Sequence, residues 1–371
     1  MKKIFTVMIL GGYGNFGQLI ATTLSKEENI SVIIAGRNEN KAKTLANQLN
    51  CQYVKLDIHQ DDLVQAFHAH AVQLVISTVG PFQNQSYDIA QAAIEAGIHY
   101  IDLADSREFV ENITQFNSIA EEKNLFICSG ASTVPSLSSA VINHFLPEYL
   151  QLNTIDIALS ASEKVPGIST LSAVLSYCGQ KFTMWKDQQW QEVYGLQNLT
   201  HQKFYHLPNK RWVGNCSVPD LALFPLNYPT VQQVTFKAGV GIGIVQISSW
   251  IVSWLKRYHI IQQPLKHVNL FHKIAQKFER FGDGLSGMQV RLNGMDHQQK
   301  PLTINWEIIG YDNEGPNIPC FASIILARKL ANQTITQSGA FSSMNLITLD
   351  EYLAEFNKIN VQTFTDKISE R

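Results

Sequence analysis

A glycine-rich turn near the start of the chain constrains its fold more than any other feature. Residues 12–17 read Gly-Tyr-Gly-Asn-Phe-Gly and come directly after an apolar run at residues 4–10. The pattern Gly-x-Gly-x-x-Gly between a strand and a helix is typical of the first turn of a dinucleotide-binding unit. The first glycine permits the tight turn, the second lets the backbone approach a pyrophosphate, and the third lets the helix pack against the strand. The predicted cofactor contacts in this turn are Gly12, Tyr13, Gly14, Asn15, Phe16 and Gly17.

The end of the second predicted strand indicates which dinucleotide this turn binds. A site for NAD has Asp or Glu about 20 residues beyond the glycines, where the carboxylate binds the ribose 2′-hydroxyl. Residues 35–38 of this chain read Ala-Gly-Arg-Asn instead, and Lys41 and Lys43 follow. A guanidinium pairs with phosphate through its planar fork. We therefore expect NADP, with Arg37 at its 2′-phosphate; the alternative is that Arg37 is only solvated at a strand end.

Apolar runs and helical patterns alternate over the first 128 residues. The predicted strands are residues 4–10, 31–35, 52–56, 73–77, 99–101 and 125–128, and the predicted helices are 15–25, 39–49, 61–70, 85–96 and 108–123. Residues 4–10, 32–35 and 74–76 are apolar nearly throughout, as in parallel strands that are covered on both faces. Six strands that alternate with helices predict a Rossmann fold, which is a doubly wound parallel sheet. Its ligand crevice lies at the carboxyl ends of the strands.

Two further strand ends provide candidate cofactor contacts. Thr78, Val79 and Gly80 follow the fourth strand, and we expect them to line the ribose and nicotinamide side of the crevice. Asp57 follows the third strand. It either reaches the adenine or caps a helix.

The candidates for proton transfer are Tyr100 and Asp102, at the fifth strand, and Thr133, after the sixth. A Tyr or Asp at the mouth of the crevice is able to handle a proton during hydride transfer. The alternative interpretation of the cluster after the fifth strand is a surface ion pair between Asp105 and Arg107.

After about residue 136 the hydrophobic pattern changes from continuous to alternating. Residues 153–159, 286–292 and 302–308 each place apolar side chains on one face and polar ones on the other. This alternation indicates antiparallel strands with one solvated face. Further helical stretches are predicted near residues 171–179, 247–261, 267–281 and 322–330. We therefore expect a second, α+β domain with a mainly antiparallel sheet.

The expected domain boundaries follow from this change of pattern. Residues 1–135 form the Rossmann domain, residues 136–345 form an α+β domain for substrate binding and dimerisation, and residues 346–371 form a C-terminal helix and tail. The partners expected are a small-molecule substrate and a second copy of the chain.

A stretch of 18 residues without charge, residues 238–255, precedes a Lys-Arg pair. It contains several glycines and serines, so it makes a poor membrane span, for which about 20 mostly apolar residues are needed. One interpretation is a helix buried in the fold or in a homodimer. The other is peripheral membrane contact through residues 238–257, with Trp250 and Trp254 at the lipid.

The composition excludes several classes of protein. A net charge of −2 gives no general attraction to nucleic acid. The five cysteines are scattered, without a Cys-x-x-Cys pair, so we expect no disulfide framework and a cytoplasmic location. No Cys or His spacing indicates a metal site. The short apolar run at residues 4–10 leads into glycines, so it predicts a strand better than a signal peptide.

Several segments together resemble the saccharopine dehydrogenase-like family. They are residues 11–17, 35–37, 79–82 and 99–103, with extensions at 130–139, 218–221 and 287–288. The resemblance implies a Rossmann NADP-binding domain joined to an α+β domain, in a soluble oxidoreductase. Members include enzymes that form saccharopine or carboxynorspermidine by reducing an imine between an amino acid or polyamine and a carbonyl compound. Others resemble enoyl reductases that act on lipid-linked substrates.

This chain departs from the amino-acid-acting members in two places. Residues 133–136 read Thr-Val-Pro-Ser where those members tend to have an Asp-Pro-Gly-like turn, and the second domain lacks an Arg cluster for a dicarboxylate. The expected function is an NADP-dependent oxidoreductase that moves a hydride to or from a C=N, C=C or C=O bond of a small or lipid-like substrate. The alternatives are a non-catalytic NADP-binding sensor or scaffold subunit, and an enoyl reductase at a membrane surface.

Overall fold

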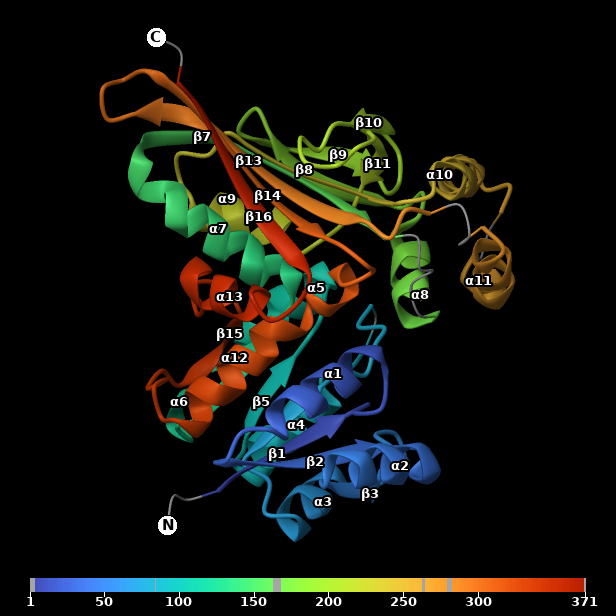
Figure 1. Ribbon diagram of the computed structural model, residues 1–371, viewed down its shortest axis with the longest axis vertical. Helices are drawn as coiled ribbons and strands as arrows, with labels where there is room; N and C mark the ends of the chain where they lie inside the picture. The colour runs from blue at the N-terminus through green and yellow to red at the C-terminus, as the bar shows by residue number, and fades with distance from the viewer. Residues whose placement is uncertain (1–3, 84, 163–167, 262–263, 279–281, 370–371) are drawn as a thin grey trace. The chain divides into compact units, whose positions relative to one another are not determined.

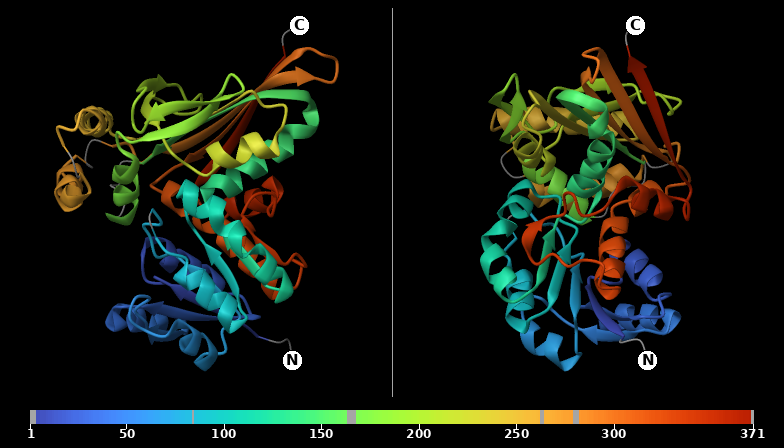
Figure 2. Two further views of the ribbon diagram at one scale, coloured as in Figure 1. Left: turned by 180° about the vertical axis from the view of Figure 1, so that it is seen from behind. Right: turned by 90° about the vertical axis from the view of Figure 1, so that its left-hand side faces the viewer.

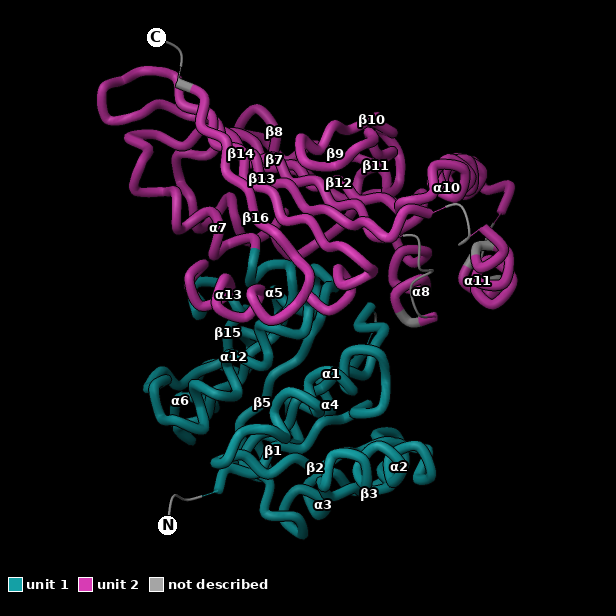
Figure 3. The backbone as a smooth tube through the Cα atoms, viewed as in Figure 1, with its two compact units in different colours: residues 1–137, 319–347 teal, residues 138–318, 348–371 magenta. Residues whose placement is uncertain are grey.

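The chain divides into two compact units in the computed structural model, which describes residues 4–83, 85–162, 168–261, 264–278 and 282–369 (Figures 1 and 3). Unit 1 consists of Met1–Leu137 with Pro319–Ile347, and unit 2 consists of Ser138–Ile318 with Thr348–Arg371. These boundaries differ from the expected ones, because a late segment of the chain returns to unit 1 and the C-terminal residues belong to unit 2.

Unit 1 contains a seven-stranded parallel sheet in the order β15-β6-β5-β4-β1-β2-β3. Its elements are β1 (Phe5–Leu10), α1 (Asn15–Leu24), β2 (Ile30–Gly36), α2 (Glu39–Leu49), β3 (Gln52–Lys55), α3 (Leu63–Ala69), β4 (Leu74–Ser77), α4 (Asp88–Ala96), β5 (His99–Asp102), α5 (Arg107–Glu111), α6 (Asn117–Glu122), β6 (Phe126–Ser129), α12 (Cys320–Ala331) and β15 (Gly339–Ser342). Helices cover both faces of the sheet (Figure 2). The Rossmann fold expected from the sequence is confirmed.

Local signals in the sequence set several of the helix boundaries in unit 1. The side chain of Asn38 accepts a hydrogen bond from the Lys41 N–H (3.1 Å) and so caps the amino end of α2. Gly97 ends α4 with a φ of 69°, a conformation that glycine adopts without strain. The single helix expected at residues 108–123 is instead α5, a 3₁₀ turn at Asn112–Phe116, and α6.

The seventh strand, β15, extends the sheet with a segment that the sequence pattern did not identify. It pairs in parallel with β6, and a further backbone bond joins the Ser343 N–H to the Ser129 carbonyl (2.9 Å). Helix α12, which precedes β15, is buried on nearly all sides and packs against α1. An unpaired strand edge leaves backbone groups without partners, so β15 completes the edge that β6 would otherwise expose.

Unit 2 contains a nine-stranded mixed sheet, in which β10-β11-β12-β7-β13-β14-β16 are neighbours and β8 and β9 extend from β12. Its elements are α7 (Ser138–Phe145), β7 (Tyr149–Ala161), α8 (Ile168–Tyr177), β8 (Lys181–Lys186), β9 (Gln189–Tyr194), β10 (Thr200–Gln202), β11 (Arg211–Asn215), α9 (Asp220–Asn227), β12 (Gln233–Val240), α10 (Gly243–Arg257), α11 (Val268–Gln276), β13 (Ser286–Asp296), β14 (Pro301–Gly310), α13 (Leu349–Phe356) and β16 (Val361–Ser369). Among the described strands of unit 2, only β12 and β7 pair in parallel, so the mainly antiparallel α+β unit is confirmed.

The alternating segments at residues 286–292 and 302–308 lie in β13 and β14, which form a hairpin and pair from Ser286 to Met295. Their apolar face carries Val290, Ile304 and Trp306, all of which are buried. The C-terminal residues, expected as a helix and tail, form α13 and then β16, which pairs with β14 along nine residues.

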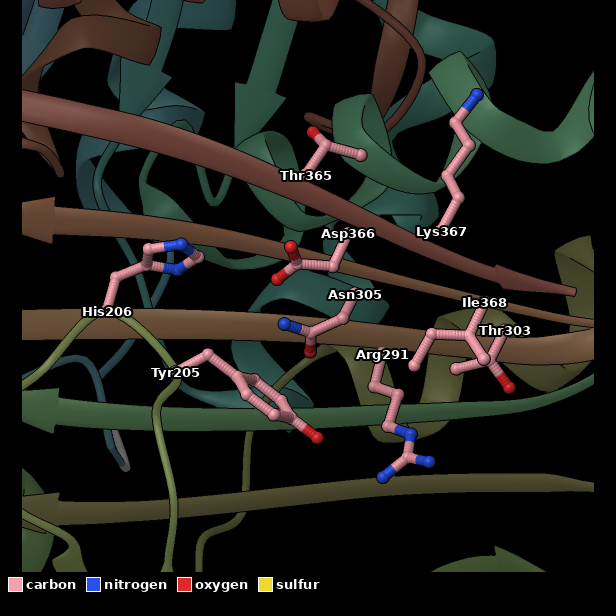
Figure 4. Close-up of a pocket in the computed structure, with 9 residues that line it drawn as sticks. All are labelled: Tyr205, His206, Arg291, Thr303, Asn305, Thr365, Asp366, Lys367 and Ile368. Atoms are coloured by element: carbon pink, nitrogen blue, oxygen red, sulfur yellow. The ribbon is translucent and has the colours of Figure 1, made fainter.

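The opposite face of this hairpin is not simply solvated, which corrects the expectation of one wet side. Glu307 is fully buried there, and its carboxylate accepts hydrogen bonds from the backbone N–H groups of Tyr205 (2.8 Å) and His206 (3.0 Å). The segment before β11 therefore crosses over the polar face and is fixed to it. Beside this crossing lies a pocket of about 460 Å³, whose lining includes Arg291, Asn305 and Asp366 (Figure 4).

Asp220 is a fully buried carboxyl group in unit 2. It lies at the start of α9, and its Oδ1 accepts a hydrogen bond from the Ser138 hydroxyl (2.5 Å). Its Oδ2 has no partner among the described residues. Burial raises the pKa of Asp220 from 3.8 to about 7.

We expect Asp220→Asn to stabilise the protein at alkaline pH. Because the folded-state pKa is raised, the folded protein holds this proton more tightly than the unfolded chain, and the resulting stability is lost as the pH rises from about 4 toward 7. Asparagine carries no charge to bury, so the free energy of unfolding should rise by about 2 kcal/mol at roughly pH 8 and change little at about pH 5. Thermal and urea unfolding at the two pH values measure this difference. An equal effect at both would show that the charge of Asp220 is not what limits stability.

Candidate cofactor site

The turn between β1 and α1 is held tightly by backbone hydrogen bonds. The N–H groups of Gly11 and Gly12 both donate to the carbonyl of Ala35 at the end of β2 (3.0 and 3.2 Å). The Thr78 hydroxyl donates to the carbonyls of Leu10 (2.8 Å) and Gly11 (3.2 Å). The sheet order runs from β4 through β1 to β2, so this turn sits where the order of the strands reverses. That point is where doubly wound sheets bind their ligands.

Two of the glycines in the turn have different roles. A Cβ on Gly17 would lie 2.4 Å from the carbonyl oxygen of Gly11 and 2.7 Å from the Cα of Gly12, so this position brings helix and strand together. A Cβ on Gly14 would meet only the Gly11 carbonyl oxygen, at 3.1 Å. The backbone at Gly14 is therefore open on the side from which a phosphate would approach.

The amino end of α1 is free to bind an anion. Its N-cap, Gly14, has no side chain to cap the helix, and the N–H groups of Asn15 and Phe16 have no partner among the described residues. Unpaired amides and the helix dipole together favour a negative charge at such an end.

Tyr13 connects this turn to the next one. Its hydroxyl accepts a hydrogen bond from the Asn38 N–H (2.9 Å), and its ring lies against Gly36, where a Cβ would come within 2.5 Å of the ring. Glycine at position 36 thus makes room for the ring. The predicted contact of Tyr13 with the cofactor stays a prediction, while its packing role is visible.

Arg37 lies in the second of these turns, directly after β2. It is exposed, and it has no ion pair or hydrogen bond among the described residues. A hollow of about 440 Å³ lies beside Tyr13, and Lys41 on α2 lines it. Gln18, Asn40 and Thr44 also line the hollow and were not among the predicted site residues. The signal for Asn40 and Thr44 in the sequence was the polar face of α2, whereas Gln18 belongs to α1.

The loops after β4 and β3 differ in what they contribute. Leu10 of β1 pairs with Ser77 of β4, so Thr78, Val79 and Gly80 follow directly beside the glycine turn. Their contact with the ribose and nicotinamide stays a prediction. Asp57 is different: its Oδ1 accepts a hydrogen bond from the His59 N–H (3.1 Å) and so shapes its own turn. The cap of α3 is Asp62, so the helix-capping alternative for Asp57 is wrong.

Tyr100 and Asp102 lie inside unit 1, which corrects their expected place at the mouth of the crevice. Tyr100 is 1% exposed and Asp102 is 0% exposed. The Oδ1 of Asp102 accepts hydrogen bonds from the N–H groups of Ala104 and Gly130 (both 2.9 Å) and from the Ser129 hydroxyl (3.0 Å). Asp102 therefore fixes the loops that follow β5 and β6.

Burial also determines the protonation of this pair. It raises the pKa of Asp102 to about 6. The three hydrogen bonds favour the charged form and act in the opposite direction, but the effect of burial is larger. Burial raises the pKa of Tyr100 well above its usual value, and the nearby charge of Asp102 adds to this.

Two further residues named from the sequence after β5 and β6 are partly or fully buried. Asp105 accepts a hydrogen bond from the Gln83 side chain (3.1 Å). Thr133 is buried at the start of the helical segment Thr133–Leu137. Its suggested part in proton transfer stays a prediction.

The comparison with protein families decides which kind of Rossmann domain this is. The family model named saccharopine dehydrogenase NADP binding domain matches residues 7–128. These residues are a saccharopine dehydrogenase NADP-binding domain. The resemblance to the saccharopine dehydrogenase-like family is thereby confirmed. The matched range covers the glycine turn, Arg37 and the loops after β3, β4 and β5.

Curated relatives are similar to about a third of this chain. A trans-acting enoyl reductase of Mycobacterium leprae is 24% identical over 144 residues, which cover 36% of this chain and 34% of that protein. A lipid droplet localized protein of Caenorhabditis elegans is 22% identical over 147 residues, with the same coverage. The aligned region thus spans about a third of the length of these relatives.

Solved structures share the fold over nearly the whole chain. The L-Glu-forming saccharopine dehydrogenase of Saccharomyces cerevisiae has a TM-score of 0.71 at 13% identity and covers 98% of this chain and 100% of its own. The homospermidine synthase of Legionella pneumophila, in complex with NAD, has a TM-score of 0.62 at 11% identity, with coverage of 98% and 93%. At these identities the similarity shows the fold.

The residues present fit NADP. The uncapped amides of α1 and the open backbone at Gly14 suit a pyrophosphate, and the unpaired guanidinium of Arg37 suits an additional phosphate. No group of three or more potential metal ligands comes together among the described residues. None of the helices in the described part of the chain combines the length and hydropathy needed to cross a bilayer.

Proposed function

We propose that this protein is an oxidoreductase that transfers a hydride between NADP(H) and the C=N, C=C or C=O bond of an organic substrate. The proposal rests on two neighbouring βα turns in a saccharopine dehydrogenase NADP-binding domain. One turn presents free backbone amides, and the other presents an unpaired arginine. NADPH supplies the hydride when it is bound, and the protein contributes binding, orientation and electrostatics.

Different residues of this chain would bind different parts of NADP. The amides at the start of α1 would hold the pyrophosphate, and Arg37 would pair with the 2′-phosphate. Lys41, in the adjoining hollow, would add a second cation. Thr78 fixes the glycine turn from β4 through two carbonyl groups, so it keeps the turn in shape before the cofactor arrives.

Among the three bond types, the enoyl reductase relative supports C=C and the two fold neighbours support C=N. NADPH oxidation by the purified protein distinguishes them, with a 2-enoyl thioester, a keto acid plus an amine, and a simple ketone as substrates. Turnover of one class identifies the bond. Tight NADPH binding without turnover of any class would overturn the oxidoreductase in favour of an NADP-binding sensor or scaffold.

We expect Arg37→Asp to weaken NADPH binding by about 10- to 100-fold, because it removes a charge-assisted pair and adds repulsion to the 2′-phosphate. NADH lacks that phosphate and should lose far less. Titration calorimetry with both cofactors measures the difference. Lys26→Asp is the matched control, because it makes the same charge change on an exposed residue beyond the other end of α1. If both cofactors lost affinity equally, Arg37 would not be the residue that recognises the phosphate.

A further inference from the structure

Helix α10 has its polarity inverted relative to an ordinary surface helix. Its buried positions are polar: the Gln246 side chain accepts a hydrogen bond from the Val240 N–H (3.2 Å), and the Ser253 hydroxyl donates to the Gly195 carbonyl (2.7 Å). Two of its three exposed positions are apolar, since Ile244 is 56% and Ile251 is 47% exposed, and the third is Ser248. An amphipathic helix normally turns its apolar stripe toward the core. The uncharged stretch at residues 238–255 is therefore not one buried helix. It consists of the end of β12, a turn and most of α10.

The exposed apolar side chains of α10 continue onto the following segment. Figures 1 and 2 show α10 and α11 near each other beyond one end of the unit 2 sheet. We call this the apolar end surface; its exposed large side chains are Ile244, Ile251, Tyr258, Ile260, Leu265, Leu270 and Ile274. Exposed apolar side chains that gather on neighbouring elements mark a site of interaction.

The charges of the same part of the chain all have one sign. Residues 221–278 contain no Asp or Glu and six Lys or Arg, although the whole chain has a net charge of −2. Lys266 and Lys273 are exposed among the apolar side chains. Arg257 is held inward by Gln197 (2.8 Å) and by the ring of Tyr194, so the end of α10 is anchored to the unit while its outer face stays open.

We propose that the apolar end surface docks on an anionic lipid surface, with α10 and α11 lying in the plane of the headgroups. Apolar side chains with flanking lysines, no acids and tryptophans at the helix are the features of interfacial helices. Two copies of this chain meeting through the same surface would bring lysines against lysines, whereas anionic headgroups complement them. The helices rest on the lipid, since no described helix is able to span it.

Flotation with vesicles tests the proposal on the full-length protein. Vesicles of phosphatidylglycerol mixed with phosphatidylcholine should carry the wild type to the top of the gradient, and pure phosphatidylcholine should carry much less. Ile251→Glu combined with Leu270→Glu should lower the partition coefficient about a hundredfold, or roughly tenfold for each apolar side chain that no longer inserts. Lys266→Glu with Lys273→Glu should lower binding to anionic vesicles by about fivefold for each lysine removed.

Leu226→Glu is the matched control, because Leu226 is a 72% exposed leucine on α9, outside the apolar end surface. It should float like the wild type. Thermal melting and NADPH affinity, measured on every variant, keep the outcome separate from that of the proposed function. The proposal is overturned if the wild type stays at the bottom with both vesicles, or if the Ile251 and Leu270 variant floats unchanged. It is also overturned if that variant instead dissociates a dimer in sedimentation velocity while no vesicle binds.

Discussion

Gly17→Ala is expected to remove NADPH binding and to destabilise unit 1 by about 3–5 kcal/mol. The added Cβ would lie 2.4 Å from the Gly11 carbonyl oxygen and 2.7 Å from the Gly12 Cα. Both atoms belong to the backbone of the same turn, so the movement of a side chain cannot relieve the overlap. The start of α1 must shift away from β1, and the amides that would hold the pyrophosphate shift with it. Urea unfolding and NADPH titration measure the two effects.

Gly14→Ala separates folding from binding at the same turn. Gly14 has a φ of −77°, which any residue adopts, and its Cβ would meet only one atom, at 3.1 Å. The free energy of unfolding should therefore change by less than about 1 kcal/mol. NADPH affinity should still fall tenfold or more, because the methyl group occupies the side that a phosphate would approach. Full NADPH affinity in this variant would show that the pyrophosphate binds elsewhere.

Asp102→Ala is expected to destabilise the protein by about 3–6 kcal/mol at roughly pH 5, because three buried donors lose their acceptor at a cost of about 1–3 kcal/mol each. The donors are the N–H groups of Ala104 and Gly130 and the Ser129 hydroxyl. At about pH 8 the loss should be smaller, since alanine also removes a buried charge whose raised pKa of about 6 already weakens the wild type there.

Asp102→Asn provides the control for the role of this residue. Its carbonyl oxygen still accepts the three hydrogen bonds, so stability at about pH 5 should stay within roughly 1 kcal/mol of the wild type. If Asp102 is structural, as its burial indicates, this variant keeps its turnover with NADPH. An Asp102→Asn protein that folds and binds NADPH but has no turnover would instead support a role for Asp102 in proton transfer.

The residues of the glycine turn could be predicted because the information for such a turn is local. The turn at residues 11–17 follows an apolar strand and opens a helix, and residues 35–38 follow the next strand, so a few neighbouring positions are enough. The depth of Tyr100 and Asp102 could not be predicted in the same way. Both belong to a four-residue central strand that is covered on both faces, and a polar residue in such a strand gives no sign of whether it reaches the crevice.

By itself, the sequence determined the Rossmann domain, its glycine turn and the arginine that follows β2, since backbone preferences and hydrophobic spacing act over a few residues. Only the tertiary structure decided that β15 lies beside β6, where Ser343 contacts Gly130 across 213 residues of chain. It alone also decided that α10 turns Gln246 and Ser253 inward and its isoleucines outward. Strand pairing and burial depend on contacts between segments far apart in the chain, and no local pattern contains that information.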